Sequence, residues 1–124
     1  MTERRRIDRI RDRCGALPAA NLEFPFGEEA AVYKVGGKMF ALVTVDGEPG
    51  HVTVKADPDD VVALQAQYRS VRPGHHMNKR HWVTVDLVDD DAAHLAVELV
   101  EDSHRLVASA LSRPIRLELG IETP

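Results

Sequence analysis

The chain has 124 residues, of which 44% are hydrophobic and 29% charged, and this length suits a single domain over residues 1–124 that buries its own core. The chain has sixteen basic and twenty acidic residues, and the resulting net charge of −4 argues against a protein that depends on long-range attraction to phosphate. No apolar run approaches the roughly 20 residues that cross a bilayer, and no signal-peptide pattern follows the N-terminal arginines. We therefore expect a cytoplasmic protein without a membrane partner.

The first predicted element is an amphipathic helix from about Thr2 to Cys14. Ile7, Ile10 and Cys14 recur at spacings of three and four, with charged residues between them. Thr2 suits the N-cap, and Gly15 suits the C-terminal stop. Cys14 is the only cysteine and has neither a partner histidine nor a CxxC spacing, so we expect a buried thiol.

An antiparallel meander of three strands is predicted after an irregular segment. Gly36 and Gly37 separate β-rich runs at 32–35 and 38–45, and a type I′ hairpin turn needs the positive φ that glycine accepts at both central positions. The second run is mostly apolar, which predicts a central strand covered on both faces. A turn and a third strand at 51–55 complete the meander.

A short helix and a further strand come next. Asp57 suits the N-cap of the helix and Pro58 its first turn, where a backbone N–H has no helical partner. The inner face of this helix is predicted to comprise Val61, Leu64, Gln65 and Tyr68. Residues 72–74 are predicted to end the segment that contains this helix. The alternation of apolar and polar residues at 82–87 predicts the strand.

The longest helix is predicted at about residues 92–111. It follows three aspartates at 89–91, whose negative charges interact favourably with the positive end of the helix dipole. Its inner stripe is predicted to comprise Leu95, Leu99, Leu106 and Ala110. Apolar and charged residues alternate at 115–119, so an edge strand and a frayed tail both remain open there.

This order of elements predicts an α+β fold, in which an antiparallel β-sheet of four to six strands packs against about three helices. One core is expected to contain Phe26, Met39, Phe40, Leu42, Trp82, Leu99 and Leu106.

Four blocks of the sequence resemble the signature of the MmcQ/YjbR family of small bacterial proteins. They are Phe24 to Gly27, Val32 to Leu42, Val54 to Pro58 and Pro73 to Trp82, within a resemblance that covers roughly Ile10 to Leu111. The resemblance implies a YjbR-like double-wing architecture, in which paired β-hairpins are proposed to contact DNA, and family members are commonly described as DNA-binding on that basis. His75 departs from the pattern, because the family often has tyrosine at this position.

The loop before the last strand carries the most polar candidate site. Lys79 and Arg80 can neutralise phosphates, Asn78 can donate and accept hydrogen bonds, and Trp82 or Tyr68 could offer a stacking face. The candidate binding residues are Lys34, Lys38, Lys55, His76, Asn78, Lys79, Arg80 and His81. They predict weak binding of double-stranded DNA, without sequence preference, by a basic hairpin and loop surface.

Two alternatives stay open for the same surface. It could serve a non-enzymatic interaction domain that binds a carboxylate or phosphate on a protein partner or small ligand, which the negative net charge favours over DNA. It could also have no ligand, with Asn78 and His81 capping the loop backbone and the cations simply solvated. In the first helix, Arg6, Arg9 and Arg13 share a stripe that could touch phosphate.

Metal and catalytic sites are not predicted. His75, His76 and His81 cluster in sequence, but no cysteine or carboxylate lies in their loop to complete a metal shell. The chain has no GxSxG, HExxH, phosphate-binding glycine loop or dinucleotide fingerprint, so we expect no cofactor, and the sequence establishes no enzymatic activity.

Overall fold

The structure is a computed structural model that describes residues 2–45, 49–74 and 77–122. Its centre is a six-stranded sheet with the order β1-β2-β3-β4-β6-β5, in which every neighbouring pair is antiparallel. The strands are β1 (Asn21–Glu23), β2 (Ala30–Val35), β3 (Lys38–Thr44), β4 (His51–Lys55), β5 (Val71–Pro73) and β6 (Trp82–Asp86). The helices are α1 (Glu3–Ala16), α2 (Pro58–Gln67), α3 (Asp90–Ser109) and α4 (Arg113–Glu118). The predicted α+β class and antiparallel sheet are confirmed.

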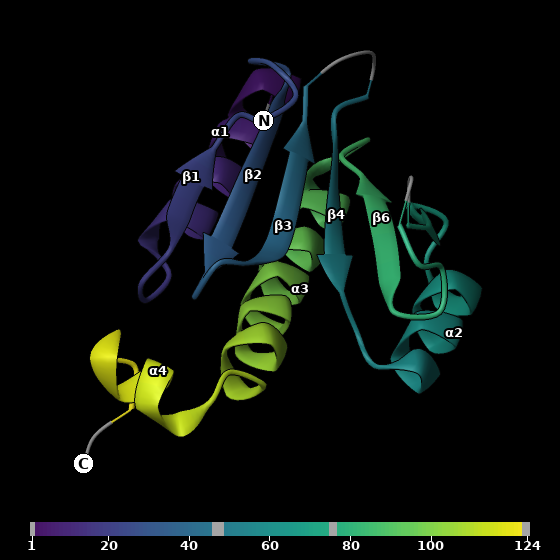
Figure 1. The fold of residues 1–124 in the computed structure, drawn as a ribbon. Helices are drawn as coiled ribbons and strands as arrows, with labels where there is room; N and C mark the ends of the chain where they lie inside the picture. Colours follow the sequence, from purple (N-terminus) through teal and green to yellow (C-terminus); the bar gives the residue numbers. More distant parts are fainter. Residues whose placement is uncertain (1, 46–48, 75–76, 123–124) are drawn as a thin grey trace.

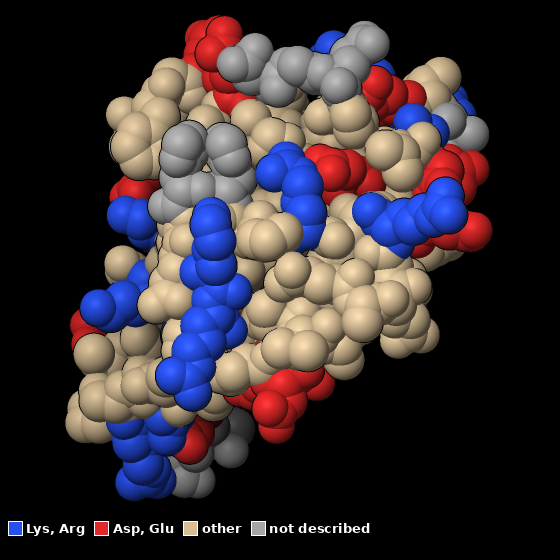
Figure 2. Space-filling view, turned by 90° about the vertical axis from the view of Figure 1, so that its right-hand side faces the viewer, with Lys and Arg blue, Asp and Glu red and all other residues tan. Residues whose placement is uncertain are grey.

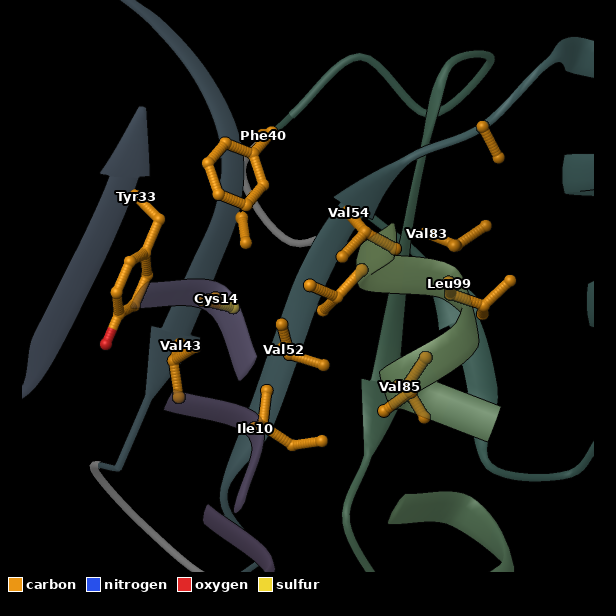
Figure 3. Close-up of a cluster of buried hydrophobic side chains, with 14 of the residues drawn as sticks. Ile10, Cys14, Tyr33, Phe40, Val43, Val52, Val54, Val83, Val85 and Leu99 are labelled. Carbon is orange, nitrogen blue, oxygen red and sulfur yellow. The ribbon is translucent and has the colours of Figure 1, made fainter. Parts of the chain in front are cut away.

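Helices α1 and α3 cover one face of the sheet, and α2 lies beside β6 near the edge that β5 forms (Figure 1). The core fills the space between these two helices and the sheet. Figure 3 shows valines of the central strands directed toward Ile10 and Cys14 of α1 and Leu99 of α3. This arrangement leaves the lower ends of β3, β4 and β6 in Figure 1 near the C-terminal part of α3.

Local signals fixed several boundaries. The Thr2 hydroxyl accepts a hydrogen bond from the Arg5 N–H at 3.2 Å, which confirms the predicted cap of α1. The Asp89 carboxylate caps α3 by accepting one from the Ala92 N–H at 2.8 Å. Gly36 and Gly37 have φ values of 58° and 79°, as the predicted hairpin turn requires. Helix α1 ends at Ala16, one residue beyond the expected stop at Gly15.

The predicted inner stripe of α3 was confirmed at Leu99 and wrong at Leu106 and Ala110, while the partly buried Leu95 packs against the core. Leu99 is buried, but Leu95 and Leu106 are only partly buried and Ala110 is exposed. The buried face instead comprises Ala92, Ala93, Ala96, Leu99, Val100, Ser103, His104 and Val107. Small side chains allow α3 to approach both α1 and the sheet closely. The face that carries them is therefore buried in place of the predicted face, which has more leucines.

Other expectations also changed. Phe26 was placed in the core but is 76% exposed, because it lies in the turn between β1 and β2, beside Gly27 with a φ of 102°. Phe40 and Leu99 are buried, and Met39, Leu42, Trp82 and Leu106 are partly buried. The outer face of β3 is therefore only partly covered.

Two short segments were also misread. Residues 71–73 form the edge strand β5, since Val71 pairs with Val85 and is buried. The C-terminal segment is neither an edge strand nor a frayed tail but the helix α4, which Ser112 caps by accepting a hydrogen bond from the Ile115 N–H. Among the described residues, no helix is long and apolar enough to cross a membrane.

Candidate functional site

Strands β3 and β4 part at the lower end of the sheet. The last register pair between them, toward this end, joins Ala41 to Val54. Beyond it, the hydroxyl of Ser103 on α3 donates to the Phe40 carbonyl at 2.6 Å and accepts from the Lys55 N–H at 2.9 Å. A buried side chain thus replaces the next bonds of the ladder and holds the two strand ends apart.

A cavity of about 360 Å³ lies at this point, and we call it the lysine groove. Its lining residues are Lys38, Met39, Lys55, Met77, Trp82, Val107, Ala110 and Leu111. They come from β3, β4, β6, the loop before β6, and the end of α3 with the residues after it.

Two glycines bring the walls of the lysine groove together. A Cβ atom on Gly36 would lie 2.6 Å from Leu111 Cδ1, so the hairpin turn rests directly on the residue that follows α3. A Cβ atom on Gly74 would lie 2.7 Å from Trp82 Cβ, and the Gly74 N–H donates to the Trp82 carbonyl at 3.0 Å. The turn and the loop therefore approach the groove more closely than residues with side chains would allow.

The described part of the loop is organised by its own hydrogen bonds. Asn78 Oδ1 accepts from the Arg80 N–H at 2.9 Å, and the Asn78 carbonyl accepts from the His81 N–H at 3.1 Å. Lys79 Nζ donates to the Gly74 carbonyl at 3.2 Å. Asn78 thus caps the loop backbone, as one alternative proposed, while His81 takes part through its main chain, whose carbonyl also accepts from Ala56.

The structure places the candidate binding residues in three settings. Lys38 and Lys55 line the lysine groove, while Asn78, Lys79 and Arg80 are exposed on the loop beside it. Lys34 is engaged elsewhere, because its ammonium lies 2.7 Å from a Glu23 carboxylate oxygen. His81 is partly buried, and His76, like His75, lies outside the described residues. Of the two aromatic side chains considered for stacking, Trp82 lines the groove, whereas Tyr68 packs against the core.

Among the described residues on the surface around α2 and β6, basic side chains do not form one continuous face (Figure 2). Figure 2 shows lysine and arginine side chains in separate groups, with acidic groups between and beside them. The arginine stripe of α1 is turned toward α3, where Arg6 lies 3.5 Å from Asp90 and Arg13 lies 3.1 Å from Glu101. These arginines join the two helices.

Two core side chains have a clearly perturbed pKa. Burial raises the pKa of the Cys14 thiol to about 12, which confirms the predicted buried thiol. Burial also raises the pKa of Tyr33, and this effect exceeds the opposing one of the hydrogen bond from Arg11. Within residues 2–45, 49–74 and 77–122, no group of three metal-ligating side chains is close enough to hold a metal ion.

Sequence reasoning missed the residues that form the inner wall of the groove. Met77 was passed over within the polar loop, and Val107 and Leu111 were not assigned to any site. The one available signal was Ser103, a small polar residue among aliphatic ones on a helix, which buries its hydroxyl only when the backbone offers it partners.

Comparison with known proteins places this fold in a family. The YjbR family model matches residues 15–106, which include both strands that carry the groove lysines. The chain belongs to the YjbR family. The uncharacterized YbdF protein of Escherichia coli O157:H7 is 39% identical over 98 residues, which cover 78% of this chain and 80% of the relative. The uncharacterized YjbR protein of Escherichia coli strain K12 is 35% identical over 82 residues, covering 65% and 69%.

Solved structures agree with this assignment. A crystal structure of a Deinococcus radiodurans protein, described by its DUF419 domain, is 38% identical and superposes with a TM-score of 0.80 over 92% of this chain and 87% of the other. A crystal structure of a Pseudomonas syringae protein shares the YjbR-like fold at 24% identity, with a TM-score of 0.63 over 86% and 99% of the two chains.

Proposed function

We propose that this YjbR-family protein binds double-stranded DNA weakly and without sequence preference. The surface comprises Lys38 and Lys55 at the strand ends and Lys79 and Arg80 on the neighbouring loop. The observation that carries the proposal is that these four cations form no ion pair with any carboxylate among the described residues. Lys34 contributes less than its position suggests, because Glu23 neutralises it.

Hydrogen bonds within the loop position Lys79 and Arg80. The Asn78 turn fixes the backbone at Arg80, and the bond from Lys79 to the Gly74 carbonyl ties the loop to the end of β5. Because these bonds hold the described loop residues 77–81 before binding, those residues lose less conformational entropy when they meet a phosphate backbone. Fold similarity alone does not establish a function, so the proposal depends on these charges.

The number of cations sets the expected strength. Four phosphate contacts give a slope of about −3.6 in log K against log salt, since each contact contributes about −0.9. Affinity should then fall roughly 150-fold between about 50 and 200 mM salt, and Kd at physiological salt should lie around 10⁻⁴ to 10⁻⁶ M. A net charge of −4 makes a tighter non-specific complex unfavourable.

Titration of a fluorescent DNA duplex at two salt concentrations tests the proposal. The charge-reversal variant Lys79→Glu/Arg80→Glu should lose binding at low salt. Arg4→Glu/Arg5→Glu is the matched control, because it changes the net charge equally at two consecutive exposed residues of α1. Absence of binding by the wild type at low salt, or equal binding by all three proteins, would remove the DNA hypothesis. Equal loss in both variants would show only a response to net charge and would also contradict it.

A further inference from the structure

The lysine groove has the lining of a small-molecule site. Six of its lining residues are apolar side chains, and the other two are the lysines at positions 38 and 55. Its volume of about 360 Å³ falls at the small end of the range for ligand pockets, roughly 300 to 1,000 Å³. That size suits a compact molecule better than a folded partner.

Charge distinguishes this groove from a larger cavity that also includes Lys55 in its lining. A space of about 730 Å³ between α2 and α3 mixes Asp57, Asp60 and Asp102 with Lys55 and Arg105 at its walls. Arg105 and Asp102 already form an ion pair there, at 3.0 Å. The lysine groove, in contrast, has two cationic and no acidic side chains among its lining residues. An anion next to an apolar wall is attracted more strongly than one in open water, because the local dielectric constant is lower.

The apolar walls favour an aromatic or branched body. Trp82 offers a large polarisable surface, and the thioethers of Met39 and Met77 adapt to a neighbouring aromatic ring. The walls are also held in place before any ligand arrives, by Ser103 between the strands and by the close approaches of Gly36 and Gly74. Such preorganisation lowers the entropic cost of binding.

We propose that the lysine groove binds a small organic anion. The Lys38 and Lys55 ammonium groups hold its carboxylate or phosphate, and its apolar body lies against Trp82, Met77 and Leu111. This activity is distinct from DNA binding because it does not use Lys79 or Arg80, although it shares the two groove lysines.

The test uses three probes that share a phenylethyl body and differ in their head group: 3-phenylpropionate, 2-phenylethyl phosphate and the neutral 3-phenylpropanamide. Trp82 is the only tryptophan of the chain, so its fluorescence reports directly on the groove. At least one anionic probe should shift this fluorescence saturably and bind at least tenfold more tightly than the amide. The carboxylate and phosphate arms then identify the preferred head group.

Variants separate groove binding from general charge attraction. Lys38→Met/Lys55→Met keeps the apolar stems and removes both charges, so it should weaken the better anionic probe at least tenfold. Arg4→Met/Arg5→Met removes two exposed charges on α1 and should leave affinity unchanged. The variant Arg80→Met removes an exposed loop charge, keeps the bond from Lys79 to the Gly74 carbonyl and adds no acid beside the groove. It should weaken DNA binding and still bind the probe, so failure of one proposal is distinguishable from failure of the other.

Four results would overturn the inference. Three of them are the lack of a saturable response to either anion, equal affinity for the anions and the amide, and unchanged probe affinity in Lys38→Met/Lys55→Met. The fourth is loss of probe binding in Arg80→Met, because it would assign the anion to the loop surface rather than to the groove.

Discussion

Replacing Ser103 by alanine tests whether its buried hydroxyl holds the ends of β3 and β4 in place. The side chain is 0% exposed and bonds to Phe40 and Lys55 at 2.6 and 2.9 Å. A buried backbone group left without its partner costs about 1–3 kcal/mol. Most of this cost should come from the Phe40 carbonyl, which stays buried without a hydrogen-bond donor. The Lys55 N–H is only part-buried, so it can form a hydrogen bond with water instead. We expect Ser103→Ala to lower the free energy of unfolding by about 2–4 kcal/mol.

Urea denaturation followed by circular dichroism and Trp82 fluorescence measures this loss. Ser109→Ala is the matched control, because it removes an exposed hydroxyl from the same helix, which donates only to the Leu106 carbonyl at 3.1 Å. The control should change the free energy of unfolding by no more than about 0.5 kcal/mol. A loss below about 1 kcal/mol for Ser103→Ala, or equal losses in both variants, would refute the assigned role of this hydroxyl.

Two further predictions concern the core thiol and the loop glycine. Burial raises the pKa of the Cys14 thiol from 9.0 to about 12, so on raising the pH the thiol ionises in the unfolded chain before it ionises in the folded protein. The free energy of unfolding is therefore unaffected by this group below about pH 9 and falls as the pH rises from 9 toward 12. Between pH 7.5 and about pH 10.5, the free energy of unfolding measured by urea denaturation should fall by roughly 2 kcal/mol more in the wild type than in Cys14→Ala. Equal falls in the two proteins would contradict this prediction. Gly74→Ala places a Cβ atom 2.7 Å from Trp82 Cβ and 2.9 Å from its carbonyl, so the loop must shift. It should cost about 1–3 kcal/mol of stability and weaken the better anionic probe at least tenfold, and unchanged values for both would show that the loop tolerates the methyl group.

Features encoded within a few residues were predicted well. The Gly36-Gly37 turn, the cap at Thr2 and the buried Cys14 each follow from local geometry or spacing. The antiparallel order of the central strands followed from the short turn between two of them. None of these features depends on knowing what packs against them from a distant part of the chain.

Features set by long-range packing were not predictable in the same way. The buried face of α3 depends on how closely α1 and the sheet approach it, and Ala96 serves this approach better than Leu95 does. Strand β1 is too short and too exposed to show alternation, and its existence depends on pairing with β2. Because β1 was missed, so was the ion pair that it makes possible, between Glu23 and Lys34.

The candidate site shows why net charge was an incomplete guide. A chain with a charge of −4 argues against anion binding only if its charges are evenly mixed, and here the pairing is uneven. Several arginines are engaged with acids away from the groove, at Arg6–Asp90, Arg13–Glu101 and Arg72–Asp86. Those pairs neutralise three carboxylates between Asp86 and Glu101, whereas the described residues that line the groove with Lys38 and Lys55 include no carboxylate. Coulomb attraction weakens with distance and is screened within about 8–10 Å at physiological salt, so a small anion at the groove responds to these two lysines more than to the total charge.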